Sequence, residues 1–278
     1  MNIHRYLRII EAVVVVGVLA ATFATVRGTE AAQVPPVTMK LDHFKRYQAN
    51  GKIVPPPVTL VDQFNDADNL PVQVKLGPAE YFLNPVQKSV WNGTKWDTFK
   101  MLHEENHLEL YPILDSLSMP TRTVLINNQF DVAGVQQVLD VGKAMYLAVP
   151  TQKVLLNGKK TGLGTPVDLS HFKGYRVSNG NPVYRVVTLK DEFGVSKNVI
   201  VLEPVMLFNP TEKRIAKADG TVAVTPIVNP DLHLVAYRTV PLTSFKAVVG
   251  LKNQFGSETI DVFGNNYLLV PSFKKIIK

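Results

Sequence analysis

The stretch His43-Phe44-Lys45-Arg46-Tyr47 decides the fold, because its pattern returns three more times along the chain. Each copy opens with His-x-x-x-Tyr, continues with a triplet of Asp or Asn, Gln or Glu, and Phe, and closes with Pro-x-x-Lys. The opening pairs are His43/Tyr47, His107/Tyr111, His171/Tyr175 and His233/Tyr237; the triplets end at Phe64, Phe130, Phe193 and Phe255; the closing pairs are Pro85/Lys88, Pro150/Lys153, Pro210/Lys213 and Pro271/Lys274. A recurrence at roughly 60–65 residues identifies an internal repeat.

The four copies alternate between two types. Copies one and three share His-Phe-Lys and end in Asn-Pro, whereas copies two and four share His-Leu and end in Val-Pro. An A-B-A-B order follows, with the A+B pair as the expected building block. The predicted domains are then 38–156 (A 41–88, B 107–153) and 165–278 (A 168–213, B 231–275). The Gly-rich stretch 157–164 is the expected linker.

The sequence pattern of each copy predicts β-structure. Short runs of β-branched and aromatic residues, such as 183–189 and 199–202, alternate with turn signals. The one helix-like pattern lies at 97–105. Because a copy of ~45 residues is too small to bury its own core, we expect an all-β fold in which copies pair into two pseudo-symmetric sandwich- or barrel-like domains. Four separate small domains are the alternative.

The N-terminus is typical of a secretion signal over residues 1–32. Arg5 and Arg8 precede an apolar run at 12–26, and small residues follow near Ala31. The alternative is an uncleaved anchor, although this run is shorter than the ~20 residues of a spanning helix. We therefore expect a secreted protein, outside the cell or in the periplasm, with no stable membrane span once the signal is cleaved.

Charge and cysteine content limit the classes of binding partner and of metal site that the chain can have. The formal net charge is +7, but the basic residues are scattered rather than gathered in a stripe. This disfavours nucleic acid and leaves anionic polymers of the cell envelope as partners. With no cysteine, disulfides and thiolate metal sites are excluded.

The repeated residues are expected to be mainly structural. The Phe should anchor the core, the preceding Asp or Asn should start a turn, and the His and Tyr, four residues apart, should form a structural polar pair. The closing lysines can pair with an acid of their own copy. If exposed, Lys88, Lys153, Lys213 and Lys274 would instead form an array that binds anions.

Two local features suggest other chemistry. His103-Glu104-Glu105-Asn106-His107 resembles the His-Glu-x-x-His helix of zinc proteases. However, His107 is also the repeated His, expected at the start of a strand, so His103 and His107 are weak metal candidates. Trp91 and Trp96 could stack on sugar rings, or pack against the sheet.

The motifs also resemble a known family. A Tyr with a basic neighbour, the triplet, and Pro-x-x-Lys after two apolar strands are similar to an uncharacterised β-rich domain of unknown function, found in tandem in secreted bacterial and archaeal proteins. The resemblance covers nearly the whole chain after the signal. It implies secretion and tandem β-domains, and it implies no catalytic activity.

We therefore expect a secreted, non-enzymatic structural or interaction protein without a cofactor. Its partner would be a protein or polysaccharide at the cell envelope, or a second copy of the chain. A carbohydrate- or anionic-polymer-binding module is the alternative, and a zinc hydrolase is the remote one.

Overall fold

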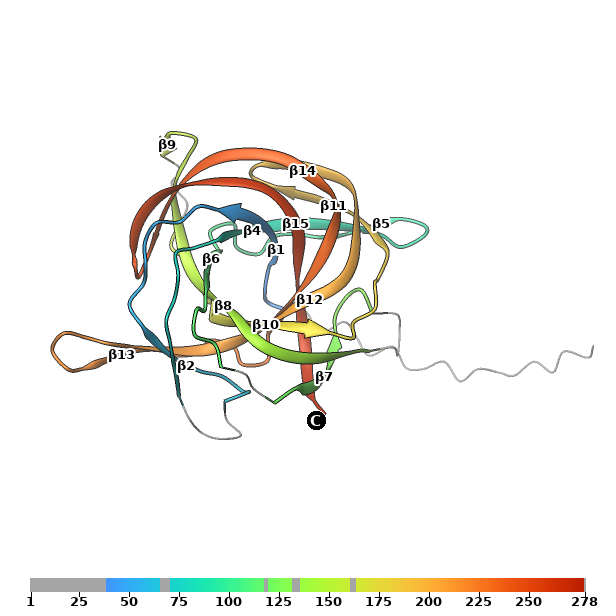
Figure 1. Cartoon of the computed structure of the whole chain (residues 1–278). Helices are drawn as coiled ribbons and strands as arrows, with labels where there is room; N and C mark the ends of the chain where they lie inside the picture. Colours follow the sequence, from blue (N-terminus) through green and yellow to red (C-terminus); the bar gives the residue numbers. More distant parts are fainter. Residues whose placement is uncertain (1–38, 66–70, 118–119, 132–135, 161–163, 278) are drawn as a thin grey trace, which may run out of the picture. The chain divides into compact units, whose positions relative to one another are not determined.

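Eight antiparallel strands, two from each repeat, form a closed ring (Figure 1). We analysed a computed structural model that describes residues 39–65, 71–117, 120–131, 136–160 and 164–277; the predicted signal at 1–32 lies outside them. The ring strands are β1 (His43–Ala49), β4 (Tyr81–Trp91), β6 (His107–Pro112), β8 (Gln137–Leu156), β10 (His171–Ser178), β12 (Gly194–Ala216), β14 (His233–Asn253) and β15 (Gly256–Ile276). Going round, the order is β1, β15, β14, β12, β10, β8, β6, β4 and back to β1.

Shorter strands and strand extensions form arms outside the ring. The remaining strands are β2 (Val58–Val61), β3 (Val72–Val74), β5 (Trp96–Phe99), β7 (Arg122–Asn127), β9 (Lys159–Lys160), β11 (Arg185–Asp191) and β13 (Val222–Thr225). The triplets lie at turns of these arms; that of repeat 3, for example, closes the β11–β12 hairpin. The repeats are numbered 1 to 4 below, over residues 41–88, 107–153, 168–213 and 231–275.

The ring strands are buried on both faces, and the alternation of side chains explains why. In β6, Leu108 and Leu110 belong to a cluster on the ring axis, whereas Tyr111 belongs to a larger cluster beneath the arms. The His and the Tyr of each repeat therefore share the outward face. This outward face becomes interior because the arms cover it.

All four repeats contribute to the core on the ring axis. At the position after the repeated His it holds Phe44, Leu108, Phe172 and Leu234. At one end of the axis the Arg46 guanidinium lies between two aromatic rings, 3.9 Å from the Tyr81 centroid and 3.5 Å from that of Tyr267. The centre of the ring is thus packed with side chains.

The all-β class and the repeat architecture are confirmed. The expected division into two pairs takes another form: repeat 2 pairs with repeat 3 through β8 and β10, and repeat 4 with repeat 1 through β15 and β1, so that residues 37–278 form one compact unit. The expected linker also differs, since Asn157 is hydrogen-bonded to Val248 of β14 at the tip of the β8–β9 hairpin (2.7 Å).

The predicted helical stretch 97–105 is wrong. Residues 96–99 form β5, which pairs with the end of β4, and a loop leads from there to β6. Pairing with β4 places Trp96 and Phe99 in an extended strand, and this tertiary contact overrides the local helical pattern. Across the described ranges, no helix of the length and apolarity needed to cross a membrane is found.

Candidate functional site

The repeated tyrosines bind across the ring, each to the triplet of the repeat two places away. Tyr47 and Tyr175 donate to aspartates, whereas Tyr111 and Tyr237 accept from asparagines. The contacts are Tyr47 Oη to Asp191 Oδ2 (2.5 Å), Tyr175 Oη to Asp62 Oδ2 (2.6 Å), Asn253 Nδ2 to Tyr111 Oη (2.7 Å) and Asn128 Nδ2 to Tyr237 Oη (2.8 Å). Repeats 1 and 3 thus exchange contacts with each other, as do repeats 2 and 4.

The same triplets form a turn and an aromatic pair. In each, the Asp or Asn side chain accepts a hydrogen bond from the Phe backbone amide at 2.7–3.0 Å, an Asx turn. The Phe ring meets the exchanged Tyr edge-on, with centroids 5.0–5.3 Å apart. Each triplet therefore supplies both a polar and an apolar contact to the same tyrosine.

Three of the repeated histidines, His43, His107 and His171, lie against the triplet of the following repeat. Gln254 Nε2 lies 2.9 Å from His171 Nε2, Gln129 contacts His43 in the same way, and Glu192 Oε1 lies 3.7 Å from His107 Nε2. Burial, reinforced by the nearby lysine of the same repeat, lowers the pKa of His107, His171 and His233 to about 3 and that of His43 well below its ordinary value. All four are thus neutral at physiological pH.

The four closing lysines are buried or partly buried rather than exposed. Lys88 and Lys153 are 0% exposed, Lys213 is 1% exposed, and Lys274 is partly buried. Each turns to the triplet of the next repeat: Lys88 lies 4.2 Å from the Phe130 ring centroid, Lys153 pairs with Glu192, Lys213 donates to Gln254, and Lys274 lies 4.2 Å from the Phe64 centroid. The predicted pairing within one copy and the predicted anion-binding array are therefore both wrong.

Each triplet consequently covers the seam between two other repeats. Triplet 2, for example, holds Tyr237 of repeat 4 through Asn128 and His43 of repeat 1 through Gln129. Those two repeats meet at the β15–β1 pairing. A single A+B pair lacks the seam that its own triplets cover, which explains why the ring closes over four repeats.

The alternation of A and B follows a rule of charge. At the second position after the repeated His, Lys45 of repeat 1 lies 3.7 Å from Asp191, whereas in repeat 2 Glu109 accepts from Asn253 at 2.6 Å. Lys173 and Val235 occupy the same position in repeats 3 and 4. Aspartate thus meets lysine, and asparagine meets glutamate or valine, so no two like charges face each other in these contacts.

The zinc-protease arrangement predicted at His103 and His107 does not form. His103 lies in a loop with its side chain 40% exposed, beside Glu105, whereas His107 begins β6, buried and stacked on Phe82 with centroids 5.4 Å apart. A zinc helix needs both rings on one helical face. Among the described residues no three metal-binding side chains come together.

The two tryptophans lie on the surface as part of a larger strip. Trp91 and Trp96 face each other across β4 and β5, with ring centroids 5.6 Å apart, and are 41% and 44% exposed. Val187 of β11 pairs with Val90, which puts Val186 beside Trp91, and Val186 in turn pairs with Ile200 of β12. We call Trp96, Trp91, Val186 and Ile200 the tryptophan strip.

A row of hydroxyl groups runs beside this strip. Ser89 Oγ and Thr98 Oγ1 are 2.8 Å apart, and Thr188 pairs with Ser89 on the other side. These residues are two positions along their strands from the tryptophan strip and therefore share its face. An apolar row and a hydroxyl row thus lie side by side on an open sheet surface.

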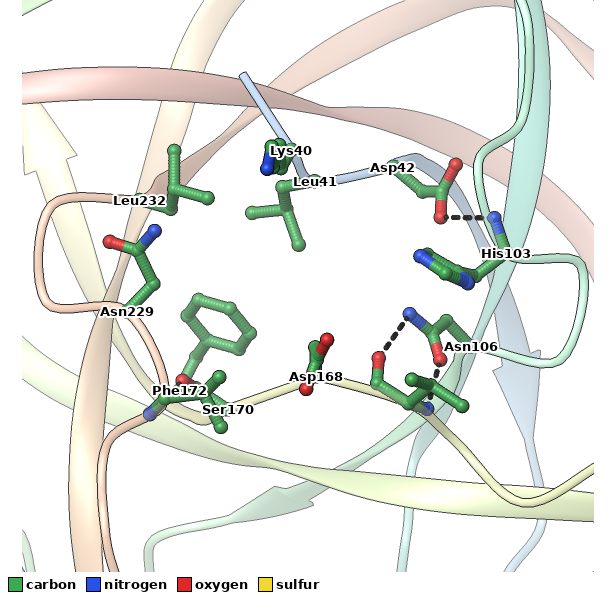
Figure 2. Close-up of a pocket in the computed structure, with 12 residues that line it drawn as sticks. Lys40, Leu41, Asp42, His103, Asn106, Asp168, Ser170, Phe172, Asn229 and Leu232 are labelled. Atoms are coloured by element: carbon green, nitrogen blue, oxygen red, sulfur yellow. Dashed lines mark hydrogen bonds between the residues drawn. The ribbon is translucent and has the colours of Figure 1, made fainter. Parts of the chain in front are cut away.

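A pocket of about 300 Å³ opens at one end of the ring axis (Figure 2). The loops before all four repeated histidines line it, and Leu41, Phe172 and Leu232 of the axial core face it. Lys40 and Asp168 are its exposed charged groups.

The buried polar groups of this pocket staple neighbouring loops together. Asp42 accepts from the backbone amide of Leu102 (2.6 Å) and from that of His103 (3.1 Å; Figure 2). Asn106 donates to the Val167 carbonyl and accepts from the Val167 amide. Ser170 accepts from the Val228 amide at 3.0 Å. Because their polar atoms are used in this way, these residues position the loops rather than a substrate.

Comparison with protein families matches residues 107–272, more than half of the 278-residue chain, to a repeat of unknown function, DUF7450. The chain belongs to the DUF7450 repeat family. The match runs from His107 of repeat 2 to Ser272, three residues before the end of repeat 4, and repeat 1 carries the same motifs. No curated protein and no solved structure matches the chain. The DUF7450 assignment therefore establishes the repeat and assigns no activity.

Two sets of residues in the DUF7450 ring escaped the sequence analysis. The stapling residues Asp42, Asn106 and Ser170 each stand immediately before a repeated His, so aligning the copies one residue further would have found them. Val186 and Ile200 of the tryptophan strip carry no such signal, because strand pairing alone brings them beside Trp91.

Proposed function

We propose that the chain is an exported, non-enzymatic interaction module whose contact surface is the tryptophan strip. The observation that carries this proposal is the exposure of four apolar side chains in one row, at 44%, 41%, 37% and 37% for Trp96, Trp91, Val186 and Ile200. With strands ~4.8 Å apart, such a row extends roughly 14 Å. Contiguous exposed apolar surface of this kind marks interaction sites in soluble proteins.

The repeated residues support this proposal by exclusion. Nearly all of their His, Tyr, Asp, Asn and Lys side chains contact other repeats, as described above, and so hold the ring together. Function then falls to the surface features that differ between the repeats. The β4–β5 hairpin with its two tryptophans belongs to repeat 1 and the connector after it, and repeat 3 has no tryptophan in its place.

The partner that best fits the strip is a polysaccharide. Indole rings stack on the apolar faces of sugar rings, and the neighbouring Ser89, Thr98 and Thr188 hydroxyls can donate to and accept from sugar hydroxyls. Export, which rests on the signal-like residues 1–32, would place the strip in contact with envelope polysaccharides.

Co-sedimentation of the full chain with insoluble chitin, cellulose and peptidoglycan tests this proposal. The double variant Trp91→Ala/Trp96→Ala should lose at least about tenfold in affinity, as stacking energies of 1–3 kcal/mol per ring imply. The matched control is Val222→Ala/Val224→Ala, which removes two equally exposed apolar side chains from β13. Binding that survives in the tryptophan double variant would exclude the strip as the sugar site.

Self-association is the second candidate, favoured by the open edge of β5. Within the described residues β5 pairs with β4 alone, so its other side can accept a strand from a second copy. Light scattering after size exclusion should then give a defined oligomer that the tryptophan double variant converts to monomer. A wild-type monomer at all concentrations would exclude self-association.

A further inference from the structure

Lys274 and Asn209 meet beneath the first triplet, in the covered outward face of the ring. Lys274 of β15 donates to Asn209 Oδ1 of β12, and both strands flank β14. Asn209 is 0% exposed. The Lys274 amino group also lies 4.2 Å from the Phe64 ring centroid, so an aromatic ring covers the pair.

The other end of the Asn209 amide is unengaged. Its Nδ2 is buried and has no hydrogen-bond partner among the described residues. Leaving a buried N–H group unsatisfied costs about 1–3 kcal/mol. No hydrogen bond therefore holds the amide nitrogen in place, so none has to be broken if this nitrogen leaves.

The surroundings favour a nucleophilic amine. Burial lowers the pKa of Lys274 to about 7, so a large fraction of the side chain is neutral at physiological pH. The charge of Asp62 raises this pKa and so partly opposes the effect of burial; Asp62 is 2% exposed and accepts the Tyr175 hydroxyl at 2.6 Å. A partly buried amine thus lies against a buried carboxamide, with a buried acid near enough for its charge to act on the amine.

We propose that Lys274 and Asn209 join in an intramolecular isopeptide bond. The lone pair of Lys274 Nζ attacks Cγ of Asn209, a new Cγ–Nζ bond forms, and the Cγ–Nδ2 bond breaks. The proton lost by Nζ moves to the leaving nitrogen within the tetrahedral intermediate, and that nitrogen departs as ammonia. The exchange of one amide for another balances without an oxidant, a reductant or any further reactant.

The bond would act as a staple in a chain that has no cysteine. It would close a loop of 65 residues between repeats 3 and 4. Like a disulfide, such a cross-link stabilises by restricting the unfolded chain. This role is independent of any partner bound by the tryptophan strip.

The chain contains its own matched control. In repeats 1 and 2 the equivalent residues are Asn84 and Lys153, but Lys153 pairs with Glu192, and Asn84 Oδ1 is left without a partner. Repeat 1 carries Gln63 where repeat 3 carries Glu192, and Gln63 donates to the Pro230 carbonyl. Lys153 is thus held as an ion pair, and the proposal assigns no bond to it.

Tryptic mass spectrometry of the full chain, purified at neutral pH, tests the proposal. The expected product is a branched peptide joining residues 198–213 to residues 253–275, lighter by one ammonia than the sum of its two linear parts. Lys274→Arg should abolish it in protein that keeps its β-sheet circular dichroism. Lys153→Arg should leave it unchanged. Quantitative recovery of linear 198–213 and 253–274 from folded wild-type protein would overturn the proposal.

Discussion

Two sets of contacts cross the ring, one between repeats 1 and 3 and one between repeats 2 and 4, and they differ in the charges they use. Between repeats 1 and 3, tyrosine donates to a buried aspartate that has a lysine nearby, as with Tyr47, Asp191 and Lys45. Between repeats 2 and 4, tyrosine accepts from an asparagine, and Glu109 replaces the lysine. The backbone frame and the Phe–Tyr packing are the same in both. The difference teaches that the A-B alternation records a choice of compatible charge around each triplet, not two kinds of unit.

Acid should destabilise the ring more than any single substitution. In the folded chain, burial lowers the pKa of His107, His171 and His233 to about 3 and that of His43 well below its ordinary value, against about 6.5 in the unfolded chain. The unfolded chain therefore takes up protons first, and stability is lost as pH falls below about 6.5. Between pH 7 and pH 5 we expect a loss of about 6 kcal/mol from His107, His171 and His233 together, measured by guanidinium denaturation.

Glu109 makes the stability of the contacts between repeats 2 and 4 respond to acid differently from that of the contacts between repeats 1 and 3. Burial raises its pKa to about 7, so its ionisation costs stability as pH rises from about 4.5 to 7, opposite in sign to the histidines. Glu109→Gln should therefore steepen the loss on acidification. A stability that is flat or rising towards pH 5 would contradict the burial of neutral histidines.

Removing the first residue of a triplet should cost more in the charged set. Asp191→Ala leaves the buried Lys45 without its acid and Tyr47 without its acceptor, and should lose about 3–5 kcal/mol. Asn128→Ala leaves only neutral groups, chiefly the Tyr237 hydroxyl, and should lose about 1–3 kcal/mol. Urea denaturation of the two variants measures the difference. Equal losses would show that charge does not distinguish the two sets.

The stability lost by placing a carboxylate in the contacts between repeats 2 and 4 should be recovered by a second substitution. Asn253→Asp brings a carboxylate to Glu109, where the asparagine now donates at 2.6 Å, and should cost about 2 kcal/mol at pH 8. Adding Glu109→Gln should recover most of that loss, with a coupling energy of about 1–2 kcal/mol in a double-mutant cycle. Additive effects would count against the charge rule.

His103→Ala should have the smallest effect. The side chain is 40% exposed and belongs to a loop whose backbone is held by Asp42. We expect a change within about 0.5 kcal/mol and unchanged zinc content by atomic absorption. A large loss of stability or of bound zinc would support a metal site at His103.

The sequence predicted the repeat, the strands and the core role of the Phe because each depends on local pattern. Phe64 and Phe130 are 3% exposed, as a core anchor should be. The sequence did not predict the closed ring, because closure depends on which strand edges pair with each other. The pairing of β8 with β10 produces no pattern in the local sequence. Pairing across a distance also overrode the helical pattern at 97–105.

The candidate sites show the same limit. Trp91 and Trp96 stood out by composition, and the strip that includes them was built by strand pairing. The lysines were misplaced because Pro-x-x-Lys looks like the exposed end of a strand. Their burial depends on a triplet from another repeat, and no spacing within one copy can reveal it.

The closure of four repeats into one ring is tested most directly by separating the pairs. Residues 38–160 and 165–278 would be produced as two fragments, and the amide ¹H–¹⁵N spectrum of each recorded alone and after mixing. One ring predicts collapsed spectra for each fragment alone, because its triplets cover seams that are absent, and dispersed β-sheet spectra after mixing. Dispersed spectra from each isolated fragment, unchanged on mixing, would contradict the ring and restore two independent domains.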